Sequence, residues 1–318
     1  MQVEAFLEDS ARRFPDKIAL ICGDRRLTYA EIDDACDRLA RGLLDAGVQR
    51  GDRVGIYLEN SVEAVLSIFS VLKAGGVFVV INPTTKADKL AFILNNSRAS
   101  ALVTHVRRQA VVQEIWNCTP HTTSIVLAGR VSDAQGDGKR VLSLDALIDP
   151  AAARGKSDTR CIDIDLAALV YTSGSTGTPK GVMLTHLNIV SAAASITTYL
   201  ENTSDDIILN VLPLSFDYGL YQVLMAFKVG GTIVLERSFT YPHAVLERLA
   251  AERVTGFPIV PTISAILLQM DLRKYDLFHL RYLTNTAAAL PTKHVVDLRA
   301  IAPHVKIYSM YGLTECKR

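Results

Sequence analysis

Short apolar runs alternate with helical patterns along most of the chain, and this alternation constrains the fold more than any other feature of the sequence. Strands are predicted, for example, at Val54–Leu58, Val77–Ile81 and Leu166–Thr172, because each run is short and predominantly apolar. Amphipathic helices are predicted between such runs, as over Tyr29–Ala46 and Ser61–Ala74. Apolar strands separated by helices form parallel sheets that helices cover on both faces. We therefore expect an α/β fold with two α/β lobes whose sheets are largely parallel.

One stretch, from Gly129 to Asp165, interrupts the alternation with Gly, Pro, Ser and Asp residues. We interpret it as connecting loops that leave room for one strand and one short helix. The chain is then expected to divide into a first lobe at about residues 1–150 and a second lobe at about residues 165–318. Two cap signals support the helix limits: Gly47 is expected to end one helix in the left-handed conformation, and Ser61 to begin the next.

The charge balance excludes several classes of partner. The 318 residues include 34 Lys and Arg against 33 Asp and Glu, a formal charge of +1, and only 7% are aromatic. Such a chain lacks both the positive electrostatic field and the aromatic stacking surface of a nucleic-acid-binding protein. It also lacks an electrostatic field that would attract it to an anionic membrane. No apolar stretch has the length of a membrane span, and Met1–Phe14 lacks a signal-peptide core, so a cytoplasmic location is expected. The five scattered cysteines indicate neither a disulfide framework nor a structural zinc site.

A glycine- and hydroxyl-rich loop carries the most specific chemistry. It follows the apolar strand that ends at Thr172 and precedes another apolar run. Glycines let backbone N–H groups converge on an anion, hydroxyls add donors, and a lysine adds a point charge, so we interpret the loop as a phosphate cradle rather than a flexible surface turn. It is no Walker A loop, because Lys180 is followed by Gly181, and its glycine spacing does not fit a dinucleotide fingerprint. The candidate phosphate-binding residues are Thr172, Ser173, Gly174, Ser175, Thr176, Gly177 and Lys180.

Residues 171–182, YTSGSTGTPKGV, resemble the signature phosphate loop of the adenylate-forming acyl-activating enzymes. This superfamily comprises acyl-CoA synthetases, the adenylation domains of nonribosomal peptide synthesis and the firefly luciferases. Leu27–Ile32, Leu72–Gly76 and Tyr311–Glu315 are similar to further elements of the family and occur in the family's order. The resemblance covers nearly the whole chain and identifies residues 1–318 as a truncated N-terminal AMP-binding domain.

The resemblance implies a role for each matching residue. The loop and Lys180 would hold the β- and γ-phosphates of ATP, and Thr314 would donate to the α-phosphate, where charge builds during attack by the substrate carboxylate. Glu315 would bind Mg²⁺, which prefers carboxylate and phosphate oxygens. Lys180, Thr314 and Glu315 are the implied catalytic residues. The adenine and the rest of the nucleotide would contact Ala287, Ala288, Ala289, Tyr311, Gly312 and Thr314.

The acyl-pocket element of the family corresponds to Pro213–Gly219, which is a hybrid. Its Pro-Leu start resembles the acyl-CoA synthetases, whereas Phe216-Asp217 resembles the Phe-Asp-x-Ser of amino-acid adenylation domains, with Gly219 in place of Ser. Asp217 is interpreted as a helix N-terminal carboxylate or, alternatively, as a partner for a substrate ammonium group. His186 is interpreted as a capping or loop-packing residue, with ligand contact as the alternative. The candidate substrate-pocket residues are Phe216, Asp217, Tyr218 and Tyr221.

The implied reaction is activation of a small carboxylic acid by ATP as acyl-AMP, with release of pyrophosphate and then transfer to a thiol. The thiol would be CoA or the phosphopantetheine arm of an acyl or peptidyl carrier protein. An amino-acid adenylation enzyme and a non-catalytic nucleotide- or acyl-binding remnant are the alternatives. In the family the chain continues beyond Tyr-Gly-x-Thr-Glu to a ribose-binding aspartate, a hinge and a C-terminal domain that carries a lysine. Because this sequence stops before them, weak or absent adenylation by these 318 residues alone is expected.

Overall fold

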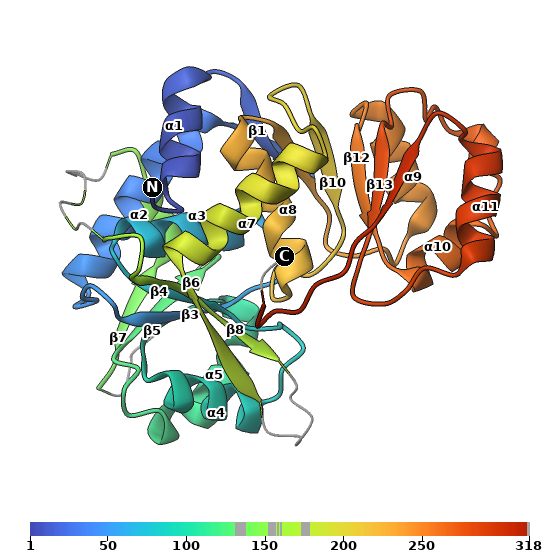
Figure 1. Cartoon of the computed structure of the whole chain (residues 1–318). Helices are drawn as coiled ribbons and strands as arrows, with labels where there is room; N and C mark the ends of the chain where they lie inside the picture. The colour runs from blue at the N-terminus through green and yellow to red at the C-terminus, as the bar shows by residue number, and fades with distance from the viewer. Residues whose placement is uncertain (131–137, 152–156, 158, 160, 173–178, 317–318) are drawn as a thin grey trace.

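The computed structural model describes residues 1–130, 138–151, 157, 159, 161–172 and 179–316. Within these residues the strands form two seven-stranded sheets, which we name sheet A and sheet B (Figure 1). Sheet A has the order β14 (Lys306–Ser309), β13 (Tyr282–Asn285), β12 (Gly256–Ile259), β10 (Ile207–Asn210), β11 (Thr232–Leu235), β1 (Ile18–Cys22) and β2 (Arg25–Thr28). Sheet B has the order β7 (Arg140–Ser143), β6 (Ser124–Ala128), β5 (Ala99–His105), β3 (Arg53–Tyr57), β4 (Val77–Val80), β8 (Leu166–Thr172) and β9 (Lys180–Thr185).

Strand pairing confirms the predicted fold class. Neighbouring strands of the described chain run parallel, except that β1 pairs antiparallel with β2 and β8 antiparallel with β9. Parallel strands place all their carboxyl ends at the same edge of a sheet, and loops at this edge commonly bind ligands in open α/β folds. The carboxyl edges of sheets A and B are therefore where the candidate site is expected.

The sheets do not divide the chain at residues 150–165, as the two expected lobes do. β1 and β2 come from the first 28 residues but belong to sheet A, where Leu20 is in register with Ile233. β8 and β9 come after residue 165 but belong to sheet B, where Ala168 is in register with Phe78. Each expected lobe thus contributes a hairpin to the other sheet. The lobe limits therefore do not give sheet membership, because strand order is fixed by pairing between distant segments, which has no local signal in the sequence.

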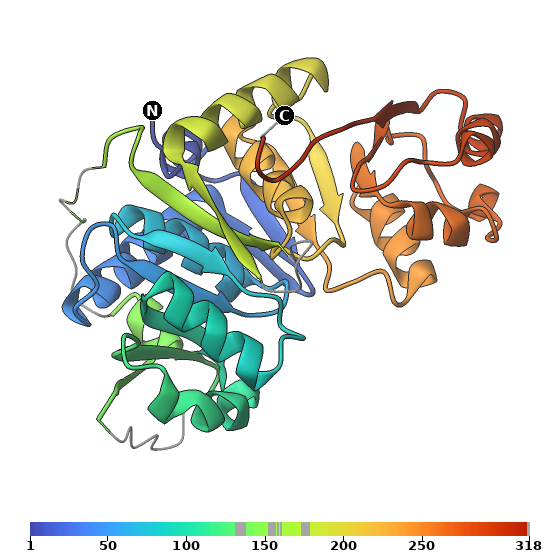
Figure 2. The same cartoon turned by 60° about the horizontal axis from the view of Figure 1, so that its bottom comes forward.

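Helices form three layers around the two sheets (Figures 1 and 2). The helices are α1 (Ala5–Arg13), α2 (Tyr29–Asp45), α3 (Val62–Lys73), α4 (Ala87–Ser97), α5 (Gln109–Ile115), α6 (Leu144–Ile148), α7 (His186–Tyr199), α8 (Asp217–Val229), α9 (Pro242–Ala251), α10 (Pro261–Leu267) and α11 (Thr292–Ile301). Side chains of α4 and α5 pack on one face of sheet B, and those of α9, α10 and α11 on one face of sheet A. The largest core cluster joins the remaining faces of both sheets through α1, α2, α3, α7 and α8.

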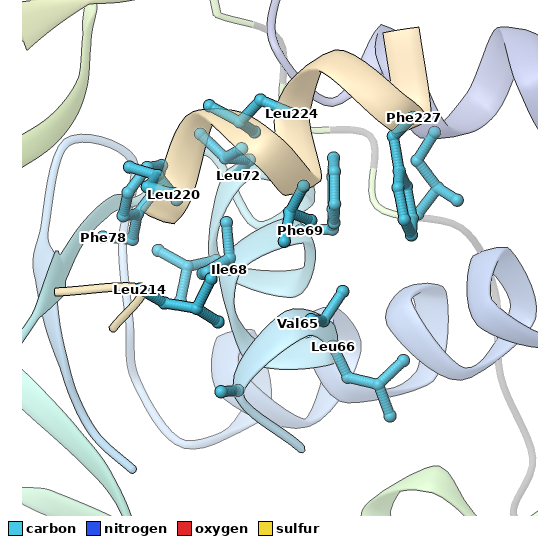
Figure 3. Packing of buried hydrophobic residues seen from close by; sticks show 14 of the residues in the cluster. Val65, Leu66, Ile68, Phe69, Leu72, Phe78, Leu214, Leu220, Leu224 and Phe227 are labelled. Carbon is cyan, nitrogen blue, oxygen red and sulfur yellow. The ribbon is translucent and has the colours of Figure 1, made fainter. Parts of the chain in front are cut away.

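Within this cluster α3 and α8 contact each other through aromatic and aliphatic side chains. Phe69 of α3 stacks on Phe227 of α8 with ring centroids 4.9 Å apart (Figure 3). Almost every residue of α3 is buried, which fits its largely apolar sequence. Ser61 caps α3 as predicted, since its side chain accepts a hydrogen bond from the Ala64 amide. The core thereby fixes α8, whose first residue is the candidate pocket residue Asp217.

Several local predictions are confirmed, whereas one α-helix and two strands were missed. Gly47 follows α2 with φ at +98°, as predicted, and β7 and α6 lie within the interrupted stretch at 129–165. The helix α1 and the strands β2 and β9 were not predicted. All five cysteines are free. None of the helices in the described ranges has the length and apolar character that crossing a membrane requires.

Candidate active site

The phosphate-loop candidate lies at the carboxyl edge of sheet B. β8 ends at Thr172 and β9 begins at Lys180, and these two residues are in register as the base of a hairpin. Thr172 is half-buried, whereas Lys180 is exposed. Residues 173–178 lie outside the described residues, so the structure does not place Ser173, Gly174, Ser175, Thr176 or Gly177. What it places is the two ends of the loop, at the edge where ligands are expected.

His186 follows this hairpin and is fully buried. Thr185, the residue before His186, caps α7 and forms a capping box with Asn188. The His186 Nδ1 instead accepts a hydrogen bond of 3.0 Å from the Val3 amide, and burial lowers the pKa of His186 to about 4. Of the sequence-based interpretations, packing therefore fits the structure and capping does not. His186 ties the N-terminal segment to the start of α7.

The pocket element connects β10 to α8 at the carboxyl edge of sheet A. Phe216 is 53% exposed, and Asp217 is the first residue of α8 and half-buried. Tyr218 and Tyr221 point into the protein and are buried. The Tyr218 hydroxyl donates to the Thr284 carbonyl at 2.7 Å, which fastens α8 to β13. Phe216 and Asp217 are thus the accessible members of the predicted pocket set, and Tyr218 holds the element in place.

Asp217 brings the pocket element and the Tyr-Gly-x-Thr-Glu element together. Thr314 Oγ1 lies 3.4 Å from Asp217 Oδ2 and donates to it. Asp217 occupies the N-terminal turn of α8, as interpreted, where the helix dipole favours a carboxylate. The candidate group for the α-phosphate therefore lies beside the candidate group for the acid substrate, although the two residues are 97 positions apart in the sequence.

The alanine triplet Ala287–Ala289 borders the Tyr-Gly-x-Thr-Glu element. Met310, the residue before Tyr311, donates its amide to the Asn285 carbonyl at 2.8 Å. Asn285 in turn donates through its side chain to the Ala288 carbonyl at 2.9 Å, which closes a turn in which Ala287 has φ at +72°. Ala287, Ala288 and Ala289 are exposed, so small side chains leave this backbone accessible. Such a surface admits the approach of a flat base.

The last described residues supply the remaining candidates. Tyr311 is 86% exposed, Gly312 and Thr314 are half-buried and Glu315 is exposed. Among the described residues no group of three or more His, Cys, Asp and Glu side chains could hold a metal ion. Mg²⁺ commonly takes only one or two protein carboxylates together with phosphate oxygens, so the single carboxylate of Glu315 is a donor set that fits.

Two buried asparagines near the pocket element were missed by the sequence analysis. Asn60 and Asn210 are 5% and 0% exposed, and the side chains of both hydrogen-bond to the backbone of Leu212, just before α8. No motif marks either residue, because both act through backbone groups, those of Asn60 in distant loops and those of Asn210 in the segment that follows it. Asn60 directly precedes the cap residue Ser61, and this position gives no hint of contacts in another sheet.

Comparison with known proteins decides the family. A model of the family described as AMP-binding enzyme matches residues 7–317. The chain belongs to this family of AMP-binding enzymes. The match includes every candidate site residue of this AMP-binding chain, from Thr172 to Glu315.

Curated relatives of this AMP-binding chain include peptide synthetases. Phosphinothricin tripeptide synthetase PhsC of Streptomyces viridochromogenes is 39% identical over 251 residues, which make up 78% of this chain and 21% of PhsC. Tyrocidine synthase 1 of Brevibacillus parabrevis is 30% identical over 262 residues, which make up 82% of this chain and 22% of the synthase. The AMP-binding chain thus spans about a fifth of the length of these relatives.

Solved structures of the family share the fold. The anthranilate CoA ligase AuaEII in complex with anthranoyl-AMP matches with a TM-score of 0.89 at 26% identity, over 99% of this chain and 60% of the ligase. VinN in complex with L-aspartate matches with a TM-score of 0.84 at 29% identity, over 100% of this chain and 77% of VinN. The two mostly parallel sheets flanked by helices are therefore the large N-terminal domain of this AMP-binding family.

Proposed function

We propose that this chain is the nucleotide-binding part of an enzyme that activates a carboxylic acid with ATP and passes the acyl group to a thiol. The observation that carries the proposal is the contact between Thr314 and Asp217, since it joins the implied α-phosphate group to the implied acid pocket. The acyl acceptor would be CoA or the phosphopantetheine arm of a carrier protein. Membership of the AMP-binding family supports the use of ATP.

Each candidate residue would then bind or orient a part of the reactants. Lys180 and the loop before it would hold the β- and γ-phosphates in line for departure as pyrophosphate. On nucleotide binding the Thr314 hydroxyl would turn its single proton from Asp217 to the α-phosphate, where negative charge grows as the acid oxygen attacks phosphorus. The exposed turn at Ala287–Ala289 and the Tyr311 ring would receive the adenine. Glu315 would bind Mg²⁺, which supplies neutralising charge to the phosphates when it is present.

Amino-acid activation is the second candidate function, and the position of Asp217 favours it. A carboxylate beside the reacting acid group repels a simple carboxylate substrate but attracts the α-ammonium group of an amino acid. The peptide synthetases among the relatives point the same way. Against it, Gly219 departs from the Phe-Asp-x-Ser pattern, and Pro213-Leu214 resembles acyl-CoA synthetases.

Titration calorimetry with Mg·ATP tests the nucleotide site. Lys180→Ala is expected to weaken binding by about 10- to 100-fold, because a charge-assisted contact with phosphate contributes on the order of 1.5–3 kcal/mol. Lys274→Ala is the matched control, since Lys274 is an exposed lysine in the connection that leads from α10 into the amino end of β13 of sheet A. A folded wild-type chain that does not bind Mg·ATP contradicts the proposal, and so does equal binding by the Lys180 variant.

A panel of acids added to the Mg·ATP complex separates the two candidate functions. If the substrate is an amino acid, Asp217→Asn is expected to weaken its binding by at least tenfold, because the ammonium group loses its counter-charge. If the substrate lacks an ammonium group, the same variant is expected to bind it as well as, or better than, the wild type.

A further inference from the structure

Asn60 lies between β3 and α3 and uses its whole side-chain amide on backbone groups of other loops. Its Nδ2 donates to the Leu212 and Glu236 carbonyls, both at 2.9 Å. Its Oδ1 accepts from the Leu214 amide at 3.1 Å. Because the side chain is 5% exposed, water cannot replace these partners easily. One asparagine thus holds three backbone groups.

The three contacts join the carboxyl edges of the two sheets. Asn60 follows β3 of sheet B, whereas Leu212 follows β10 and Glu236 follows β11, both of sheet A. The backbone at Asn60 is itself fixed, because the next residue, Ser61, caps the buried helix α3. The pocket element is therefore held from the opposite sheet, by a residue anchored in the core.

Asn210 holds the same loop from its other side. Its Oδ1 accepts from the Leu212 amide at 3.0 Å, and its Nδ2 donates to the Gly219 carbonyl at 3.1 Å. The Phe216 amide donates to the Pro213 carbonyl at 3.1 Å and closes a turn. Asn60 and Asn210 together therefore bond to four backbone groups between Leu212 and Gly219, the stretch that carries Phe216 and Asp217.

We propose that Asn60 is a positioning residue of the acid-substrate pocket, which it holds by clamping residues 212–214 so that Phe216 and Asp217 face the substrate. The inference rests on the proposed function for the identity of the pocket. Asparagine is required because the clamp needs two N–H donors and one acceptor in one short side chain. Aspartate has the same shape but offers no donor, and its charge would repel the Leu212 and Glu236 carbonyls.

The first test is the exchange of backbone amides in the wild-type chain and in the variants Asn60→Asp and Asn60→Ala. The wild-type Leu212 and Leu214 amides are expected to exchange as slowly as those of β10, since both are bonded to buried side chains. In the variants, exchange is expected to rise at least tenfold within residues 212–219 and little elsewhere. Wild-type amides at 212 and 214 that exchange like those of exposed loops would overturn the proposal, even if neither variant folds.

The second test compares binding of the acid with binding of the nucleotide. The probes are Mg·ATP and, in its presence, the tightest of anthranilate, benzoate, octanoate, L-aspartate and L-phenylalanine. Asn60→Ala is expected to weaken binding of the acid at least tenfold, while the affinity for Mg·ATP changes less than twofold. General destabilisation of the protein would instead weaken the binding of both. Asn202→Ala is the matched control, because it removes a half-buried asparagine with two hydrogen bonds at the amino end of β10.

The outcomes separate this inference from the proposed function. If Asn60→Ala weakens the binding of acid and nucleotide equally, or changes neither, the inference is overturned and the proposed function still stands. A wild-type chain that binds neither Mg·ATP nor any acid refutes the function, and it also removes the substrate role of Asn60, whatever the amide exchange shows about the clamp.

Discussion

Replacement of Gly219 by alanine should destabilise the protein, although Gly219 lies within a helix. Alanine in place of glycine ordinarily stabilises a helix by about 1 kcal/mol. Here a Cβ atom would lie 2.3 Å from the Pro213 carbonyl oxygen and 2.8 Å from that of Leu212, whereas ordinary contact begins at 3.4 Å. Relief needs a movement of about 1 Å by a loop that Asn60 and Asn210 hold in place.

The size of the effect follows from these two opposing contributions. Overpacking a rigid site costs about 1–3 kcal/mol, from which the helix gain of about 1 kcal/mol is subtracted. Because the 2.3 Å contact is with backbone, the upper part of this range applies, and a net loss of about 1–2 kcal/mol is expected for Gly219→Ala, measured as a lower midpoint in thermal and urea unfolding. The larger Gly219→Ser, which restores the Phe-Asp-x-Ser pattern of amino-acid adenylation domains, should lose at least as much.

Gly42→Ala in α2 is the matched control. Its Cβ would approach the Leu147 side chain at 2.6 Å, but this contact is with the end of a side chain that can rotate away. Gly42→Ala is therefore expected to lose less stability than Gly219→Ala, or to gain some. A Gly219→Ala protein as stable as the wild type would refute the reasoning, because it would mean that the loop before α8 moves freely.

Two further predictions concern the turn after β13 and the N-terminal segment. Ala287→Gly should raise the unfolding midpoint by an amount equivalent to about 0.5–1 kcal/mol, since glycine relieves the strain at φ of +72°; Ala288→Gly, at a residue without positive φ, should give no such gain. Burial raises the pKa of Glu4 from 4.5 to about 7, so the folded state holds this proton more tightly than the unfolded state and loses stability as pH rises between these values. Glu4→Gln removes this titration, and its stability relative to the wild type should increase by about 3 kcal/mol between pH 4.5 and pH 8 in urea unfolding; an unchanged difference across that range would contradict the burial argument.

The local features of the sequence were sufficient for the fold class and for most of the candidate residues. The apolar runs at β3, β4 and β8 and the caps at Gly47 and Ser61 depend on neighbouring residues alone, so they can be predicted without the fold. The phosphate loop and the Tyr-Gly-x-Thr-Glu element can also be recognised without the fold, because each is a contiguous stretch of the sequence. Their functional roles remain predictions, and residues 173–178 of the loop lie outside the described residues.

Pairing between distant segments could not be predicted. The hairpin of β1 and β2 joins sheet A and that of β8 and β9 joins sheet B, because edge and central positions are decided by which strands meet in three dimensions. Tyr218 illustrates the same limit at the site. Its sequence position suggests a pocket residue, but nothing in the neighbouring sequence indicates that its hydroxyl donates to the Thr284 carbonyl, 66 residues away.

The sequence by itself determined which chemical groups this protein offers: hydroxyls, glycines and a lysine after one strand, and a threonine and a glutamate after another. Only the tertiary structure decided which of these groups meet. Thr314 reaches Asp217 across 97 residues, and Asn60 reaches Leu212 across 152. The physical reason is that such contacts arise where the carboxyl edges of two sheets are packed together by a shared core, and a hydrogen bond to a distant backbone carbonyl leaves no pattern in the residues around it.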